Sequence, residues 1–275
     1  MIHLFALLSL LLCGVCYTGF QNSSHFRNTG SRRSLLLLVF GGALLLRLLL
    51  AYTTHGFSND IACFAAWADR IFTLGPGQFY SAEMFTDYPP GFMYVLYLIG
   101  ALRSLLQIPY YSDLHILLLK LPAILCDIAC GFLLYREAVK RLHFSDLQGI
   151  FAASAYLFQP AVILNSSCWG QVDSVYTLMI ILMCLFLMKG NLLPAYAVYG
   201  LGVLLKPQML IFTPVLLAGI WDHVFLQDFS WRKFFYNLCG GLVVICGMLL
   251  LCAPFGLTAA ISQYTSTLGS YEYAA

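Results

Sequence analysis

Apolar runs long enough to cross a membrane recur along this chain, and they constrain its fold more than any other feature. A transmembrane helix needs about 20 mostly apolar residues. In lipid, each helix pairs its own backbone polar groups, so helices are the expected elements. Of all residues, 61% are hydrophobic and only 9% are charged. The runs lie at residues 1–20, 34–52, 92–108, 114–135, 148–166, 177–188, 192–205, 208–221 and 235–254.

We therefore predict an all-α, multi-pass transmembrane helical bundle with about 8–9 membrane segments. The whole chain is expected to form one membrane domain, in which residues 1–33 are an extra N-terminal helix and a basic cytoplasmic linker. The net charge is +2. No basic run with interleaved aromatic residues is present in the sequence, so nothing points to a nucleic-acid partner.

The basic residues set the expected topology. Arg27, Arg32 and Arg33 precede the run 34–52 and mark a cytoplasmic segment under the positive-inside rule. The run then crosses outward, which makes the loop 53–91 extracytoplasmic. A polar loop of this length between membrane helices is typically functional. We therefore expect 53–91 to be an active-site loop.

The topology does not close if every run between 92 and 166 is a full crossing. In that case Asp173 lies on the face opposite Asp60 and Asp87, and the basic loop 136–147 lies outside. One partial or re-entrant helix among these runs removes both faults, because such backbone is tolerated where it lines a cavity. The sequence leaves open which run this is.

The loop 53–91 contains an amphipathic helix that opens at Asp60. Its apolar residues recur at a spacing of three or four, and Gly75-Pro76-Gly77 ends it. A helix of this kind beside a membrane is expected to lie in the interface plane. The apolar face comprises Ile61, Phe64, Ala65, Ala68, Ile71 and Phe72.

Two acidic positions in this loop are candidates for chemistry. Asp60 is placed to act as a general base or as a ligand for a substrate hydroxyl, although an aspartate before an apolar helix is also a common cap. Asp87 and Tyr88 precede Pro89 and Pro90, which fix the backbone and hold both side chains on a rigid bend. The prolines also match an ordinary helix start.

A polar motif, Trp169-Gly170-Gln171-Val172-Asp173, lies between apolar runs. On a regular helix Gln171 and Asp173 point apart, but a bend at Gly170 lets them converge. The indole of Trp169 offers a flat face to a sugar ring, and the amide and carboxylate offer directional hydrogen bonds. The alternative is an interfacial aromatic anchor with polar neighbours.

Charged residues inside the apolar runs are a further group of candidates. Arg47 either serves a functional site or extends its charge to the interface. Lys206, followed by Pro207 and Gln208, either binds an anion such as a lipid-linked phosphate or occupies a short cytoplasmic turn. Lys120 and Asp127 share one helix face, and their partners are left open.

Cofactors are not expected from the residue pattern. Most of the ten cysteines lie in apolar runs, where a thiol behaves as a small hydrophobe. The sequence contains no metal-ligand cluster, so we expect no essential metal and no nucleotide. A divalent cation between Asp60 and Asp87 remains an open alternative.

Taken together, these motifs resemble the GT-C superfamily of membrane glycosyltransferases. The likeness is strongest to bacterial relatives of the glycosylphosphatidylinositol mannosyltransferases and to the glucosyltransferases of lipid-linked oligosaccharide assembly. It extends over residues 34–220. The matching positions, in chain order, are Asp60, Tyr88-Pro89-Pro90, Lys120, Pro122, Asp127, Phe158, Pro160, Ala161, Trp169 to Asp173 and Lys206 to Gln208.

This resemblance implies a multi-pass protein of the cell membrane that transfers a hexose, mannose or glucose, at the extracytoplasmic face. The donor would be a polyprenyl- or dolichyl-phosphate sugar, and the acceptor a glycan, lipid or protein. Asp60 would deprotonate the acceptor, and Lys206 or Arg47 would neutralise the departing phosphate. Asp87 is the second catalytic candidate and, with Tyr88, would position the acceptor or support Asp60. The remaining candidates would bind substrate: Tyr88, Pro89, Pro90, Trp169, Gln171, Asp173 and Gln208.

Two other functions remain in competition. Embedded charges also suit a transporter or lipid flippase. A non-catalytic truncated subunit is the third possibility, because the chain is shorter than the members of that superfamily and stops in SYEYAA, within an apparent loop. We therefore expect the sequence to be a fragment.

Overall fold

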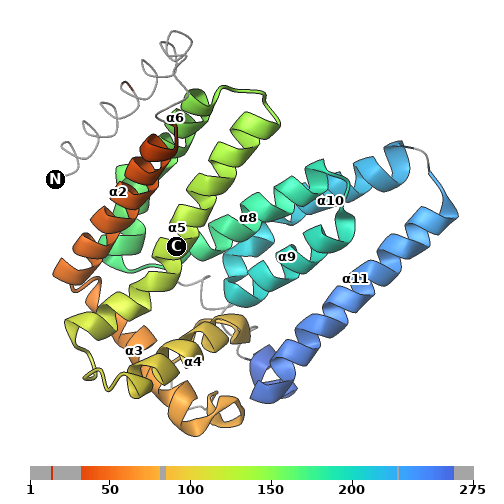
Figure 1. The fold of residues 1–275 in the computed structure, drawn as a ribbon. Coiled ribbons are helices and arrows are strands. Elements are labelled where there is room, and N and C mark those ends of the chain that lie inside the picture. The colour runs from red at the N-terminus through yellow and green to blue at the C-terminus, as the bar shows by residue number, and fades with distance from the viewer. Residues whose placement is uncertain (1–13, 15–31, 81–84, 228, 263–275) are drawn as a thin grey trace, which may run out of the picture. The chain divides into compact units, whose positions relative to one another are not determined.

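The computed structural model describes residues 14, 32–80, 85–227 and 229–262 (Figure 1). These residues form helices and no β-strands, which confirms the all-α prediction. The predicted N-terminal helix at 1–20 lies outside them. The elements are α2 (Arg32–Thr53), α3 (Ser58–Leu74), η3 (Pro76–Gln78), α4 (Pro90–Leu105), α5 (Asp113–Lys140), α6 (Asp146–Leu157), α7 (Pro160–Ile163), η4 (Leu164–Trp169), α8 (Asp173–Met188), α9 (Leu192–Leu205), η5 (Pro207–Phe212), α10 (Thr213–Trp221), η6 (Asp222–Leu226), α11 (Trp231–Cys252) and η7 (Ala253–Phe255).

Several helices are long and apolar enough to cross a membrane, so the chain is an integral membrane protein. The described residues contain four such helices, or five if one bent pair counts as a span. The predicted count of eight to nine is therefore not reached. The spans are Arg33–Thr53, Asp113–Lys140, Pro207–Leu226 and Trp231–Phe255, and the bent pair joins Asp146–Leu157 to Pro160–Trp169. Three shorter apolar helices are Pro90–Leu105, Asp173–Met188 and Leu192–Leu205.

The chain divides into two compact units, which we describe separately. Unit 1 comprises Met1–Ile61 and Tyr111–Ser174, and unit 2 comprises Ala62–Tyr110 and Val175–Ala275.

In unit 1, α2 and α5 are antiparallel neighbours. Lys120, early in α5, contacts Ala51 near the end of α2, whereas Tyr135, late in α5, shares a core cluster with Ala43. The end of α2 and the start of α5 therefore lie at the same end of unit 1, and the basic loop 136–147 lies at the other end, with Arg33.

The bent pair in unit 1 breaks at a proline. Pro160 has no backbone N–H and cannot continue α6, and the two segments meet at 51°. The second segment ends beside the end of α2, because the backbone oxygens of Ser167 and Cys168 accept from the Thr54 hydroxyl. Asp60 and Asp173 therefore lie at the same end of unit 1.

In unit 2, the apolar face predicted for α3 is buried. Phe64, Ala65, Ala68 and Ile71 are at most 2% exposed. The helix ends at Leu74, directly before the predicted Gly75 stop. The face packs against α4, where a β-carbon at Gly100 would meet the Ala68 oxygen at 2.4 Å.

The rest of unit 2 is built from α8, α9, η5, α10, η6 and α11. An apolar core joins α8 to α9, η5, α10 and η6, with Met183, Leu192, Met209 and Leu216 among its buried members. α11 packs on α9 but has no fully buried residue. One long face of α11 is thus uncovered in the described part of the chain.

Candidate functional site

Asp60 is the centre of a polar cluster in unit 1. Its Oδ2 atom accepts hydrogen bonds from Trp169 Nε1 at 2.9 Å and from Gln171 Nε2 at 2.5 Å. The donors lie 109 and 111 residues further along the chain. Asp60 is half-buried, and Trp169 is 50% exposed. We call Asp60, Trp169 and Gln171 the Asp60 cluster.

The carboxylate does not act simply as a helix cap. α3 begins at Ser58, so Asp60 lies inside the first turn, where a negative charge also favours the helix dipole. Its side chain is nevertheless bound to the segment 169–171. The cap interpretation of Asp60 therefore explains its position in the sequence but not its partners.

Gly170 makes the cluster possible. It ends the π-helix η4 with a φ of 89° in the left-handed region, which turns Trp169 and Gln171 toward the same carboxylate. A β-carbon here would lie 2.6 Å from Ile61 Cδ1 and 3.3 Å from Lys120 Cε. The left-handed conformation thus favours glycine, and any added side chain would also have to displace the end of the Ile61 side chain.

The backbone also ties the two halves of the cluster together. The Phe57 amide donates to the Trp169 carbonyl at 2.8 Å, and the rings of the same two residues lie 5.2 Å apart. Gly56 allows this approach, because a β-carbon there would meet the Trp169 oxygen at 2.7 Å. Trp169 is therefore fixed through both its backbone and its side chain.

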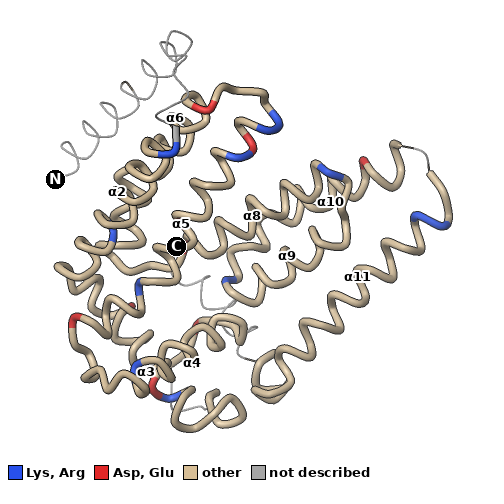
Figure 2. Tube along the Cα trace, in the orientation of Figure 1, with Lys and Arg blue, Asp and Glu red and all other residues tan. Residues whose placement is uncertain are grey.

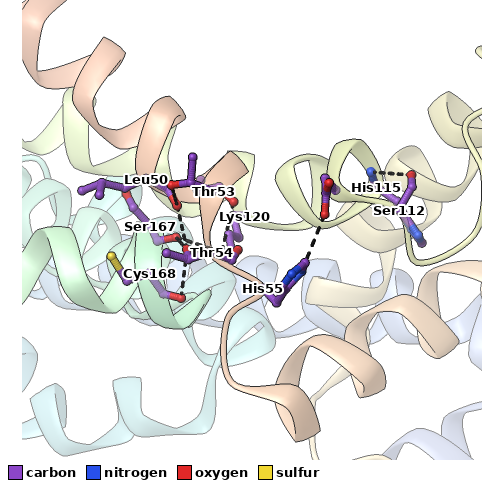
Figure 3. A network of polar contacts seen from close by, with 11 residues as sticks. Leu50, Thr53, Thr54, His55, Ser112, His115, Lys120, Ser167 and Cys168 are labelled. Atoms are coloured by element: carbon purple, nitrogen blue, oxygen red, sulfur yellow. Dashed lines mark hydrogen bonds and ion pairs between the residues drawn. The ribbon is translucent and has the colours of Figure 1, made fainter.

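Lys120 joins the chain segments that carry the cluster, and Figure 3 shows it beside Thr54 and Ser167. The side chain is fully buried, and its Nζ donates to the backbone oxygens of Thr54 at 2.7 Å, Ser167 at 2.9 Å and Ala51 at 3.2 Å. The Thr54 hydroxyl is a further partner at 3.1 Å. These oxygens belong to the end of α2 and to η4, so the ammonium joins the two segments that carry Asp60 and Trp169.

A second buried charge network lies deeper in unit 1. Arg47 Nε is 3.3 Å from Asp127 Oδ2, and both side chains are fully buried. Asp127 Oδ1 accepts from Tyr156 at 3.1 Å and from Ser174 at 2.5 Å. Arg47, a predicted phosphate partner, thus binds a carboxylate inside the helix bundle.

Asp173 does not join the Asp60 carboxylate. It begins α8 and accepts from the Asn165 side-chain amide at 2.9 Å. The bend at Gly170 therefore brings Trp169 and Gln171 together on Asp60, while Asp173 contacts the Asn165 side chain.

The remaining predicted residues lie in unit 2. Pro90 begins α4 and Pro89 caps it in an extended conformation, which confirms the helix start. Lys206 Nζ lies 5.7 Å from the ring centroids of both Tyr88 and Tyr176. Lys206 and Tyr88 are each 8% exposed.

A hydrogen bond from Tyr80 stabilises the backbone bend before α4. Tyr80 donates its hydroxyl to the Tyr88 backbone oxygen at 3.1 Å. Burial raises the pKa of the Tyr80 phenol far above its ordinary value, so it remains a neutral donor at any physiological pH. Asp87 and Gln208 are both partly exposed.

Some residues of the site were missed by sequence reasoning. Lys120 was recognised only as an embedded charge, and Phe57, Thr54 and Asn165 were not recognised at all. Two adjacent threonines at the end of a span were a usable signal, because a hydroxyl there can satisfy the last helix carbonyls. No cluster of three or more potential metal ligands occurs among the described residues.

Comparison with known protein families identifies the chain at the level of its family. Residues 35–273 match the family described as GPI transamidase subunit PIG-U. The chain belongs to this family. No curated protein matches it at a significant level.

This membership corrects the predicted activity. The family is named for a subunit of a transamidase, not for a sugar transferase, so the assignments as a GT-C glycosyltransferase, mannosyltransferase-related enzyme and hexosyltransferase are wrong. The polyprenyl-phosphate sugar donor loses its support with them. The non-catalytic subunit, one of the alternatives to the enzyme, agrees better with the family. The candidate residues remain, without the reaction for which they were chosen.

Proposed function

We propose that this chain is a non-catalytic membrane subunit of a GPI transamidase complex and that the Asp60 cluster binds the glycan of the lipid anchor. Membership of the complex rests on the family match over residues 35–273. The binding role rests on one observation. Both donors, Trp169 and Gln171, bind Oδ2 of Asp60, which leaves Oδ1 to accept from a ligand.

The chemistry of the cluster suits a carbohydrate. Sugar hydroxyls are donors that a carboxylate oxygen can accept, and an exposed indole supplies an apolar face of the size of a sugar ring. Preorganisation lowers the cost of binding, because Asp60 and Trp169 are already held in place by Gln171 and Phe57. The same features provide binding without any need for a nucleophile.

The embedded charges of unit 1 give little support to a transporter. Arg47 is bound to Asp127, and Lys120 is bound to backbone oxygens of neighbouring segments. A translocation pathway needs charges that face a cavity. These side chains act instead as internal fasteners.

We place the Asp60 cluster on the extracytoplasmic face of its membrane. Arg33 lies at the start of α2 and marks the cytoplasmic side, and Asp60 follows the other end of that helix. Adding α4, α8, α9 and residues 1–20 to the full-length spans would bring the membrane segments to about 8–9.

Replacement of one carboxyl oxygen of Asp60 by an amide nitrogen, in Asp60→Asn, tests the proposal. In cells that lack the gene for this chain, Asp60→Asn should give less than about one fifth of the wild-type surface level of a GPI-anchored reporter, a loss of about 1 kcal/mol in binding. The variant should still co-purify with the other subunits. The matched control is Asp113→Asn, because Asp113 also begins a helix of unit 1 and faces only the exposed His55.

Each outcome has a defined meaning. Normal reporter levels with Asp60→Asn would contradict glycan binding at this cluster. If the wild-type chain neither restores the reporter nor co-purifies with transamidase subunits, its place in the complex is wrong.

A further inference from the structure

An apolar pocket of about 400 Å³ lies in unit 2, and its lining includes no residue of the Asp60 cluster. α9, α10, η6 and α11 form its walls. Its lining includes Tyr196, Gly200, Leu216, Asn237, Gly241 and Met248. This volume is within the range of small-molecule sites.

Glycines keep the pocket open. A β-carbon at Gly241 would have no atom within 4 Å, so the space beside it is empty. On the opposite wall, a β-carbon at Gly200 would meet Met248 Sδ at 2.9 Å. Gly200 therefore permits α9 and α11 to approach each other, and Gly241 leaves room between them.

The shape of the pocket suits a hydrocarbon chain. Its lining extends along α11 from Phe234 to Met248, about 21 Å at the rise of an α-helix. Half of a bilayer hydrocarbon core is about 15 Å thick, so one acyl chain of one leaflet can fill this length. Within the lining, Tyr196 donates to Asn237 Oδ1 at 3.3 Å, which satisfies the polar groups without a ligand.

One end of the pocket has the composition of a membrane interface. Phe225 and Phe234 of the lining belong to an aromatic cluster with Trp221, Phe229 and Trp231. Aromatic residues of this kind are enriched at the level of lipid head groups.

The charges at this end are mainly basic. Arg232 and Lys233 are exposed in the first turn of α11, and Lys189 is exposed in the turn after α8. Figure 2 shows basic residues at the start of α11 and after α8. His223 joins that turn to η6 through the Leu187 carbonyl at 2.8 Å. Asp222 also lies here and accepts from Gln227 at 2.7 Å. The basic residues mark this end as cytoplasmic.

We propose that this pocket binds an anionic glycerophospholipid of the cytoplasmic leaflet. One acyl chain occupies the space beside Gly241, and the phosphate lies at Arg232 and Lys233. Basic residues beside a gap between transmembrane helices are a known arrangement for anionic head groups. The site is independent of the Asp60 cluster and of the anchor substrate.

Two glycines of α11 provide a matched test. Gly241 lines the pocket and Gly247 does not, yet each has open space around an added β-carbon. The full complex would be purified with bilayer lipids, exchanged against phosphatidylserine or phosphatidylcholine, and its bound lipid counted by native mass spectrometry. Gly241→Leu should reduce retained phosphatidylserine about tenfold, and Gly247→Leu should leave it unchanged.

A second variant tests the head group without altering the pocket. Arg232→Ala with Lys233→Ala should remove the preference for phosphatidylserine over phosphatidylcholine, and this exposed pair can be changed even if Gly241→Leu fails to fold. Equal retention of phosphatidylserine by Gly241→Leu would overturn the proposal. Loss of another subunit with unchanged lipid would overturn it as well, because the pocket would then be a protein contact.

Discussion

Lys120 in unit 1 and Lys206 in unit 2 are both buried lysines in or beside apolar helices, but their surroundings differ. The Lys120 ammonium has four oxygen partners between 2.7 and 3.2 Å. The Lys206 ammonium faces the rings of Tyr88 and Tyr176, each centroid 5.7 Å away. One lysine fastens backbone segments, whereas the other adjoins aromatic faces.

The difference shows that an embedded charge is not by itself a binding site. From the sequence, Lys206 was either an anion ligand or part of a short turn, and the partners of Lys120 were left open. In the structure Lys120 organises the Asp60 cluster, because it joins Thr54 and Ser167. The contacts around a buried charge, and not its presence alone, decide whether it has a structural role or binds a ligand.

The largest loss of stability should come from breaking the buried ion pair between Arg47 and Asp127 in unit 1. Asp127→Asn leaves the Arg47 guanidinium buried without a counter-charge, which should lower the free energy of unfolding by about 4 kcal/mol. Chemical denaturation in detergent micelles measures this free energy of unfolding. The double variant Arg47→Met with Asp127→Leu should recover most of the loss. If it recovers none, the pair is not the reason for the instability.

Lys120→Met should have the next largest effect. Removal of the ammonium leaves the Thr54 and Ser167 carbonyls buried without this donor and should cost about 3 kcal/mol. Protease cleavage between residues 164 and 172 should also become faster, because η4 loses its fastening. A variant with unchanged stability and unchanged cleavage would remove the distinction between the two lysines.

Gly170→Ala tests whether the bend that Lys120 supports is as crowded as the structure indicates. The left-handed conformation costs alanine about 1–2 kcal/mol, and the contact with Ile61 adds a similar amount. Gly75→Ala is the matched control, because Gly75 has a φ of 75° but no atom within 4 Å of an added β-carbon. Thermal denaturation should show a larger loss for Gly170→Ala. Equal losses of stability in the two variants would show that backbone strain alone, without the contact to Ile61, explains the effect.

Lys206→Met should have the smallest effect on stability. Contacts between a cation and an aromatic ring contribute about 1 kcal/mol, and methionine fills much of the same volume between Tyr88 and Tyr176. Measured beside Lys120→Met in the same detergent, this variant should lose about a third as much stability. A loss as large as that of Lys120→Met would show that both lysines are fasteners.

Much of the local structure could be predicted from the sequence. The buried face of α3, its stop at Gly75, the start of α4 at Pro90 and the bend at Gly170 each follow from local rules of period and backbone conformation. The pairing of Asp60 with Trp169 did not, because no spacing rule links residues 109 positions apart in the chain. The predicted number of spans is not confirmed in the described residues, because α4 and α8 are apolar but shorter than a full span.

The error in function has a chemical origin. A carboxylate, an indole and an amide at the end of membrane helices suit a sugar, whether the protein transfers that sugar or only binds it. Asp60, Trp169 and Gln171 therefore carry information about the ligand class but not about the reaction. The order of such motifs in the chain resembled that of a glycosyltransferase. Only the family match distinguishes a protein that transfers a sugar from a subunit of a transamidase.

The most direct test of the account is retention of radiolabelled anchor lipid by the purified complex. We predict that complexes containing Asp60→Asn assemble with all subunits and retain less than about one fifth of the anchor lipid bound by wild type. Asp113→Asn complexes should retain the wild-type amount. Full retention by Asp60→Asn, in an intact complex, would contradict the claim that the Asp60 cluster binds the substrate.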